Sequence, residues 1–164
     1  MAIVSSPIIT QRLSVATSSP GTQVGTEVLT TDGGHAVFLI ALSAIAIYDA
    51  VAILNSSSAT GATMCAAPIT TTNAAQAARM GIAQNAIAVG EYGWIRTAGY
   101  DLRVNVAIAT QPAVPLFTTA TGGVLSGTIV SGGFAVGVIA KTSAASASAV
   151  QCVMANGVIA HSLG

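Results

Sequence analysis

The residues able to do chemistry are few and far apart in this chain. The histidines are His35 and His161, and neither belongs to a pattern of Cys or His residues at metal-ligand spacing. The five carboxylates are also scattered along the sequence, at Glu27, Asp32, Asp49, Glu91 and Asp101. No local pair of carboxylates is placed for acid–base work. We therefore predict no metal site and no catalytic carboxylate pair.

Motifs for nucleophilic or phosphate chemistry are missing too. The sequence contains no G-x-S-x-G, and residues of β type, not a helix with a Lys-Ser/Thr pair, follow Gly122-Gly123 and Gly132-Gly133. We predict a protein that is not an enzyme, with no catalytic residues, no cofactor and no small-molecule substrate. Distant residues can still converge in a fold, so the enzyme class is disfavoured and not eliminated.

What the chain does contain is one short cluster of residues suited to protein contacts. Tyr92, Trp94, Arg96, Tyr100 and Arg103 fall within twelve positions. Aromatic and arginine side chains dominate interface energetics, because they bury large areas and make planar contacts. On a strand, Trp94 and Arg96 point to one face, and Ile95 and Thr97 point to the other. We predict these five residues as a candidate interface, with a plain core role for Trp94 as the alternative.

The composition of the 164-residue chain also favours a protein that assembles. Only 6% of the residues are charged and the net charge is zero, whereas about 25% are charged in a typical soluble domain. A neutral surface promotes association and provides no field to concentrate nucleic acid. We predict assembly with copies of itself or a partner and no nucleic-acid binding; the alternative is a Ser/Thr-rich monomer.

We predict that short strands position this cluster. Tyr92 begins a strand over residues 92–98, a turn is predicted at 99–101, and residues 102–108 alternate as a half-buried strand. Turn residues recur every eight to twelve positions, which favours an antiparallel sandwich or barrel. We predict an all-β domain over residues 35–164. Residues 1–34, rich in Ser, Thr, Pro and Gly, are predicted as an extended N-terminal arm, with a disordered tail as the equal alternative.

The apolar run over residues 36–54 has two interpretations. It is nearly long enough to span a membrane, but Asp49 lies within it and its flanks lack Lys and Arg. We favour two buried strands, at 36–42 and 45–54, and no membrane partner. The N-terminus has no secretory signal pattern, and Cys65 and Cys152 are expected to be buried and reduced.

Several segments carry a family resemblance. The sequences RMGIAQNAIAVGEYGWIRTAG (79–99), LRVNVAIA (102–109), PLFTTATGGVL (115–125) and GVIAKTSAASASA (137–149), with YDAVAI upstream (48–53), resemble the small capsid decoration, or cement, proteins of tailed bacteriophages. The resemblance implies a β-sandwich or barrel subunit that binds the outside of an icosahedral shell as dimers or trimers. Its partners would then be the major capsid protein and copies of itself.

That resemblance implies a structural protein located on the outer surface of the virion capsid and made in the host cytoplasm. Two alternatives stay open at this point. One is a small membrane-associated protein that spans the bilayer with residues 36–54. The other is a fibre-like or pilin-like structural subunit.

Overall fold

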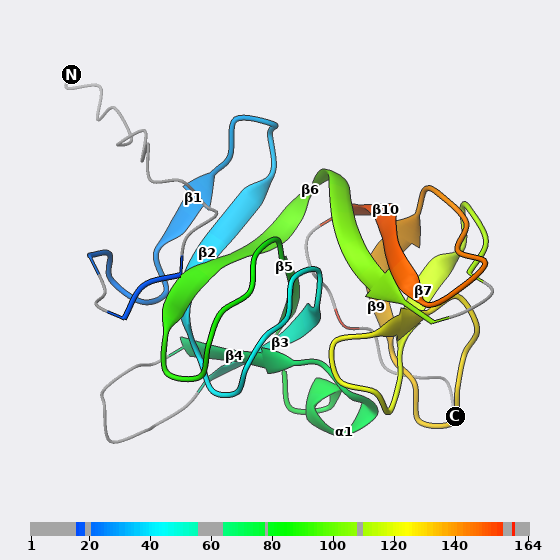
Figure 1. Ribbon diagram of the computed structural model, residues 1–164, viewed down its shortest axis with the longest axis horizontal. Helices are drawn as coiled ribbons and strands as arrows, with labels where there is room; N and C mark the ends of the chain where they lie inside the picture. Colours follow the sequence, from blue (N-terminus) through cyan, green and yellow to red (C-terminus); the bar gives the residue numbers. More distant parts are fainter. Residues whose placement is uncertain are drawn as a thin grey trace.

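In the computed structural model the described part of the chain folds into strands joined by loops, with one short helical segment (Figure 1). The structure describes residues 16–18, 21–55, 64–77, 79–107, 110–155 and 159. The strands of this part are β1 (Glu27–Leu29), β2 (His35–Ala41), β3 (Ala50–Asn55), β4 (Met64–Pro68), β5 (Arg79–Ala83), β6 (Tyr92–Val106), β7 (Pro115–Thr118), β8 (Leu125–Ser126), β9 (Ala135–Ala140) and β10 (Ser148–Met154). A single helical turn, α1 (Thr71–Ala74), begins at the N-cap Thr70.

Strands β2 to β6 close into a first barrel of five strands. The pairing order is β2-β4-β3-β5-β6, and β6 pairs back onto β2. Most of these pairs are antiparallel, but β2 and β4 run parallel, with Ile40 opposite Cys65. The fold class is thus mainly β, as predicted, and the barrel is mixed where we expected an antiparallel one.

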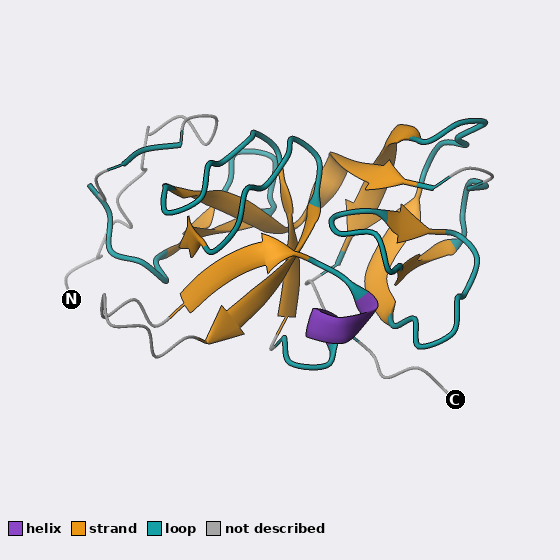
Figure 2. Cartoon of the chain, turned by 60° about the horizontal axis from the view of Figure 1, so that its bottom comes forward, coloured by secondary structure: helices purple, strands orange, loops and turns teal. Residues whose placement is uncertain are grey.

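Strands β6 to β10 close into a second barrel with the same connectivity. Its order is β6-β8-β7-β9-β10, and β10 pairs back onto β6. Again the first strand of the barrel runs parallel to the third, with Val106 of β6 opposite Leu125 of β8. The second barrel therefore repeats the first strand for strand. Figures 1 and 2 show the two groups of strands side by side, with β6 passing from one to the other.

The continuity of β6 corrects our prediction of a turn at residues 99–101. Gly99 and Asp101 have φ angles of 150° and 56°, and the register with β10 shifts between Cys152 and Met154. These are the marks of a bulge, which bends a strand without ending it. The polar turn-type residues misled the prediction because a bulge and a turn use the same left-handed backbone.

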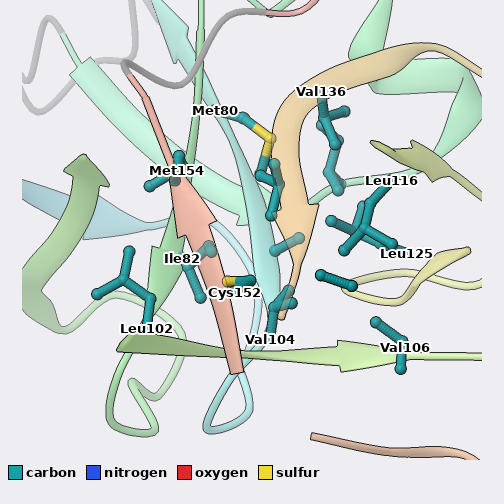
Figure 3. Packing of buried hydrophobic residues seen from close by; sticks show 14 of the residues in the cluster. Met80, Ile82, Leu102, Val104, Val106, Leu116, Leu125, Val136, Cys152 and Met154 are labelled. Atoms are coloured by element: carbon teal, nitrogen blue, oxygen red, sulfur yellow. The ribbon is translucent and has the colours of Figure 1, made fainter. Parts of the chain in front are cut away.

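Each barrel has its own apolar interior. The first is filled by Val37, Leu39, Ala41, Ile45, Val51, Ile53, Ala66, Ala83, Ile87 and Ile95. The second interior belongs to a larger cluster, which also contains Ala50, Ala52, Met80 and Ile82 from the outer faces of β3 and β5 (Figure 3). The two barrels therefore pack against each other as well as sharing β6.

The apolar run 36–54 forms strands β2 and β3, joined by a loop. Its first half was predicted correctly, but the second strand starts at Ala50 and not at residue 45. Ile45 instead makes one isolated bridge to Ile87. Among the described residues, no helix is long and apolar enough to cross a membrane.

Part of the predicted arm lies on the chain's own barrel. Residues 27–29 form β1, which pairs antiparallel with the start of β2, and Thr17 bridges to Tyr92. Residues 1–15 lie outside the described part. The boundary between arm and domain at residue 34 stays a prediction.

Candidate contact surfaces

The predicted interface cluster lies on β6, but the two barrels divide it. Trp94 and Arg96 belong to the first barrel and are buried, at 2% and 9% exposure, and Tyr92 beside them is half-buried. Tyr100 lies at the bulge and is 69% exposed, and Arg103 is exposed on the second barrel. All five residues thus lie on one strand, as their spacing in the sequence suggested, but their side chains do not form one surface.

Trp94 lies in a small aromatic cluster on the outside of the first barrel. The ring of Phe38 packs against the rings of Trp94 and Tyr92, with centroids 5.1 Å and 6.1 Å apart. Val28 of β1 packs against this cluster. The segment that precedes β2 therefore covers the aromatic face of β6 within the same chain.

Arg96 fixes the turn between β1 and β2 onto β6. Its guanidinium donates to both carboxylate oxygens of Asp32, at 3.0 Å and 2.7 Å, and to the carbonyl of Ala98 at 3.3 Å. A side chain at either Gly34 or Gly99 would collide with the guanidinium. The two glycines thus leave the space that this ion pair occupies.

The carboxyl of Asp32 is adapted to this arrangement. Partial burial by itself would raise its pKa, but the hydrogen bonds from Arg96, Thr30 and the backbone of Gly34 and the charge of Arg96 act in the opposite direction. Together they lower the pKa of Asp32 from 3.8 to about 2. The pair therefore stays ionised throughout the neutral and mildly acidic range.

The remaining carboxylates also hold the fold together. Glu27 pairs with Arg79 and Asp101 with Lys141. The buried Asp49 accepts hydrogen bonds from the Ala46 amide at 2.8 Å and the Asn105 side chain at 3.0 Å. Glu91 accepts from the Ala88 amide at 3.3 Å.

The described residues contain no group of three or more His, Cys, Asp or Glu side chains that could hold a metal ion. The described cysteines, Cys65 and Cys152, are both buried, and no disulfide joins them. Burial raises the pKa of the Cys152 thiol to about 12, against a smaller opposing effect of Lys141. That thiol is therefore protonated and hard to reach in the native state.

Arg103 helps to join the second barrel to the loops of the first. Its guanidinium carbon lies 5.8 Å from the ring centre of Tyr48. Its backbone carbonyl accepts a hydrogen bond at 3.1 Å from the side-chain amide of Gln84, which also accepts from the Arg103 amide. The Asn105 amide donates to the carbonyl of Tyr48 at 2.9 Å. The contact with Tyr48 gives the Arg103 side chain a structural task, and the backbone bonds of residues 103 and 105 join β6 to the two loops of the first barrel.

A second candidate surface was missed in the sequence. Two loops, residues 42–49 and 84–91, run side by side at one end of the first barrel, linked by paired hydrogen bonds between Ile45 and Ile87. Three large apolar side chains on these loops are exposed: Leu42 at 45%, Ile47 at 46% and Val89 at 65%. We call these two loops the end-loop surface. Only the alternation of buried Ile with exposed Leu, Ile and Val could have signalled it, and the uniformly apolar composition of this region hid that alternation.

Comparisons with known proteins agree with the fold. No family model matches the chain, and no curated protein sequence matches it. Among solved structures, the chain is similar to the head fiber gp8.5 N base of bacteriophage phi29, with a TM-score of 0.51 and 14% sequence identity. The match covers 81% of this chain and 98% of that one. At this identity the likeness shows a shared fold.

Proposed function

We propose that this chain is a structural protein of a phage virion that attaches to the head. The observation that carries the proposal is the fold shared with the base of a phage head fiber over nearly the whole of that chain. Fold alone does not fix function. The proposal therefore also draws on the surface of the molecule.

Three physical features support a structural role. Only 6% of the residues are charged and the net charge is zero, each of the five carboxylates has a structural partner, and both barrels are closed. Closure protects strand edges from unspecific pairing with other chains. A protein of this kind makes its contacts through loops and outer faces, repeated over many copies.

In its finer form, the proposal is that the protein decorates and stabilises an icosahedral capsid. It binds the outer surface of the major capsid protein lattice as a dimer or trimer, and it contains no catalytic residues. The family resemblance seen in the sequence and the neutral surface support this form.

The test is to mix the purified protein with empty shells of the major capsid protein from the same phage. We expect it to sediment with the shells, to bind at many symmetry-related positions, and to raise the temperature at which the shells break. Failure to sediment with them at any protein excess would refute attachment to the head.

A second candidate function is the base of a head fibre, which the matched structure favours because that chain is itself a fibre base. The shell experiment separates the two candidates. A fibre base would bind the shells and leave their disruption temperature unchanged, whereas a cement protein would raise it.

A further inference from the structure

The second barrel provides an internal reference for the first. The Tyr48 amide donates to the Ala83 carbonyl and the Ala113 amide to the Ala140 carbonyl, both at 2.8 Å. Tyr48 and Ala113 also share a left-handed backbone, with φ angles of 68° and 61°. Position 48 thus corresponds to 113, and position 83 to 140. The barrels match in register as well as in strand order.

The same match extends to the loops that close the barrel ends. In the first barrel, Ile45 and Ile87 bridge each other and are buried. Their equivalents in the second barrel, Thr110 and Ala144, also bridge each other and are buried. In each barrel, a bridge between two buried residues of the loop pair therefore closes the barrel end.

The outward sides of the two loop pairs are different. The first barrel exposes Leu42, Ile47 and Val89, where the second has Ala107, Pro112 and Ser146. Because the second barrel closes without large apolar side chains at these positions, closure does not require them in the first. A contact outside the chain is a physical reason for exposing them.

The end-loop surface exposes little charge, because Asp49 is buried and Glu91 is half-buried. Asp49 is only 7% exposed and is held by the Ala46 amide, and Glu91 is held by the Ala88 amide. No other residue of the two loops, 42–49 and 84–91, is charged. A surface with one half-buried carboxylate and no other exposed charge can meet a copy of itself across a rotation axis with little of the repulsion that like charges would create.

We propose that the end-loop surface binds the same surface of a second copy of this chain. The proposal rests on that part of the proposed function in which the chain assembles with itself, and it is independent of capsid binding. The two loops, residues 42–49 and 84–91, hold sixteen residues, of which Ile45, Asp49 and Ile87 are buried; the patch is smaller than the roughly 20–30 residues a side of a stable specific interface, so the contact is a weak one. Rotational symmetry then brings Leu42 and Val89 of one copy onto the equivalent loops of the other.

The first experiment measures the molar mass of the full chain in solution, by light scattering or sedimentation, over a range of concentrations. The test variant is Leu42→Ala with Val89→Ser, which introduces the residues that the second barrel has at these positions. Because both copies carry the substitutions, the contact loses about ten apolar carbons, each of them about half buried in it, and we expect self-association roughly 1,000-fold weaker. The matched control, Ile129→Ala with Val130→Ser, removes exposed apolar side chains from a loop of the second barrel and should associate as the wild type does.

The second experiment introduces one reactive thiol. Both native cysteines are buried, so oxidation of a Val89→Cys variant should yield disulfide-linked copies, and an Ile129→Cys variant should not. This experiment does not use the double variant. Its result therefore tests the proposal even if the double variant folds poorly.

The possible outcomes separate the two proposals. A wild type that is monomeric at every concentration, or a double variant that associates as tightly as the control, overturns the self-contact. If the protein is monomeric and still sediments with capsid shells through these loops, the surface is a capsid contact and our inference is wrong, while the proposed function stands. Self-association through the loops without binding to shells leaves the inference in place and refutes attachment to the head.

Discussion

Replacing Asp32 with Asn tests whether the ion pair with Arg96 fixes the β1–β2 turn onto the barrel. The variant keeps the size of the side chain and an oxygen that can accept from Arg96, but it removes the charge. The lowering of the Asp32 pKa from 3.8 to about 2 corresponds to about 2.4 kcal/mol before screening. Because the Asp32 side chain is 43% exposed, solvent reduces the expected loss to about 1 kcal/mol.

The pH dependence gives the sharper measurement. The pKa of Asp32 is lower in the folded chain than in the unfolded chain, so the stabilisation is complete above pH 3.8 and is lost as the pH falls from 3.8 through about 2. Urea unfolding of the wild type should show this loss in that window. In Asp32→Asn the contribution of this group to the pH dependence should be absent.

The control is Asp101→Asn, which removes the carboxylate of the pair with Lys141. That pair is more exposed, with side chains 63% and 41% accessible, so its loss should change the free energy of unfolding by less than about 0.5 kcal/mol. If Asp32→Asn unfolds with the same free energy and the same pH dependence as the wild type, the pair with Arg96 does not stabilise the turn and the reasoning is refuted.

Three further predictions concern the packing. Gly123→Ala should lose about 2 kcal/mol more than Gly132→Ala by urea unfolding, since both glycines have positive φ but only Gly123 lies against the Asp49 carboxylate; equal losses would contradict that contact. Leu116→Ala in the second barrel should lose about 3 kcal/mol and lower one transition shared by both barrels, because they share β6; two transitions in calorimetry would show that the barrels unfold separately. Native Cys152 should not react with a thiol reagent at pH 8 and should react fully in denaturant; rapid labelling of the folded chain would show that it is accessible.

The strand content could be predicted from the sequence because it depends on local patterns. Residues 102–106 alternate between apolar and polar side chains, and they form the predicted half-buried strand with Leu102, Val104 and Val106 inside the second barrel. The repeat could not be predicted in the same way. Equivalent interior positions require only a suitable volume and a partner for any polar atom, so Ile45 and Ile87 of one barrel are matched by Thr110 and Ala144 of the other, with the Thr110 hydroxyl donating to the Ala107 carbonyl. Little sequence similarity then remains to be detected.

The candidate interface was likewise predicted in part from local sequence, while the rest of its structure depends on distant segments. The sequence correctly identified β6 as the strand with the largest aromatic and basic side chains, and it correctly placed Trp94 and Ile95 on opposite faces. It could not tell which of these faces β1 would cover, because that depends on pairing between residues 27–29 and 35–37. It also could not show that Arg96 has its partner in Asp32, sixty-four positions away.

The amino-acid sequence by itself determined that this chain builds a β-fold with a neutral surface, because strand propensity, turn chemistry and net charge are properties of the residues themselves. Only the tertiary structure decided that β6 continues through its bulge and belongs to two barrels, that Trp94 is covered, and that Leu42, Ile47 and Val89 are exposed together on neighbouring loops. The physical reason is that burial on a strand depends on which distant segments pack over each face, and alternation along the strand does not specify those segments.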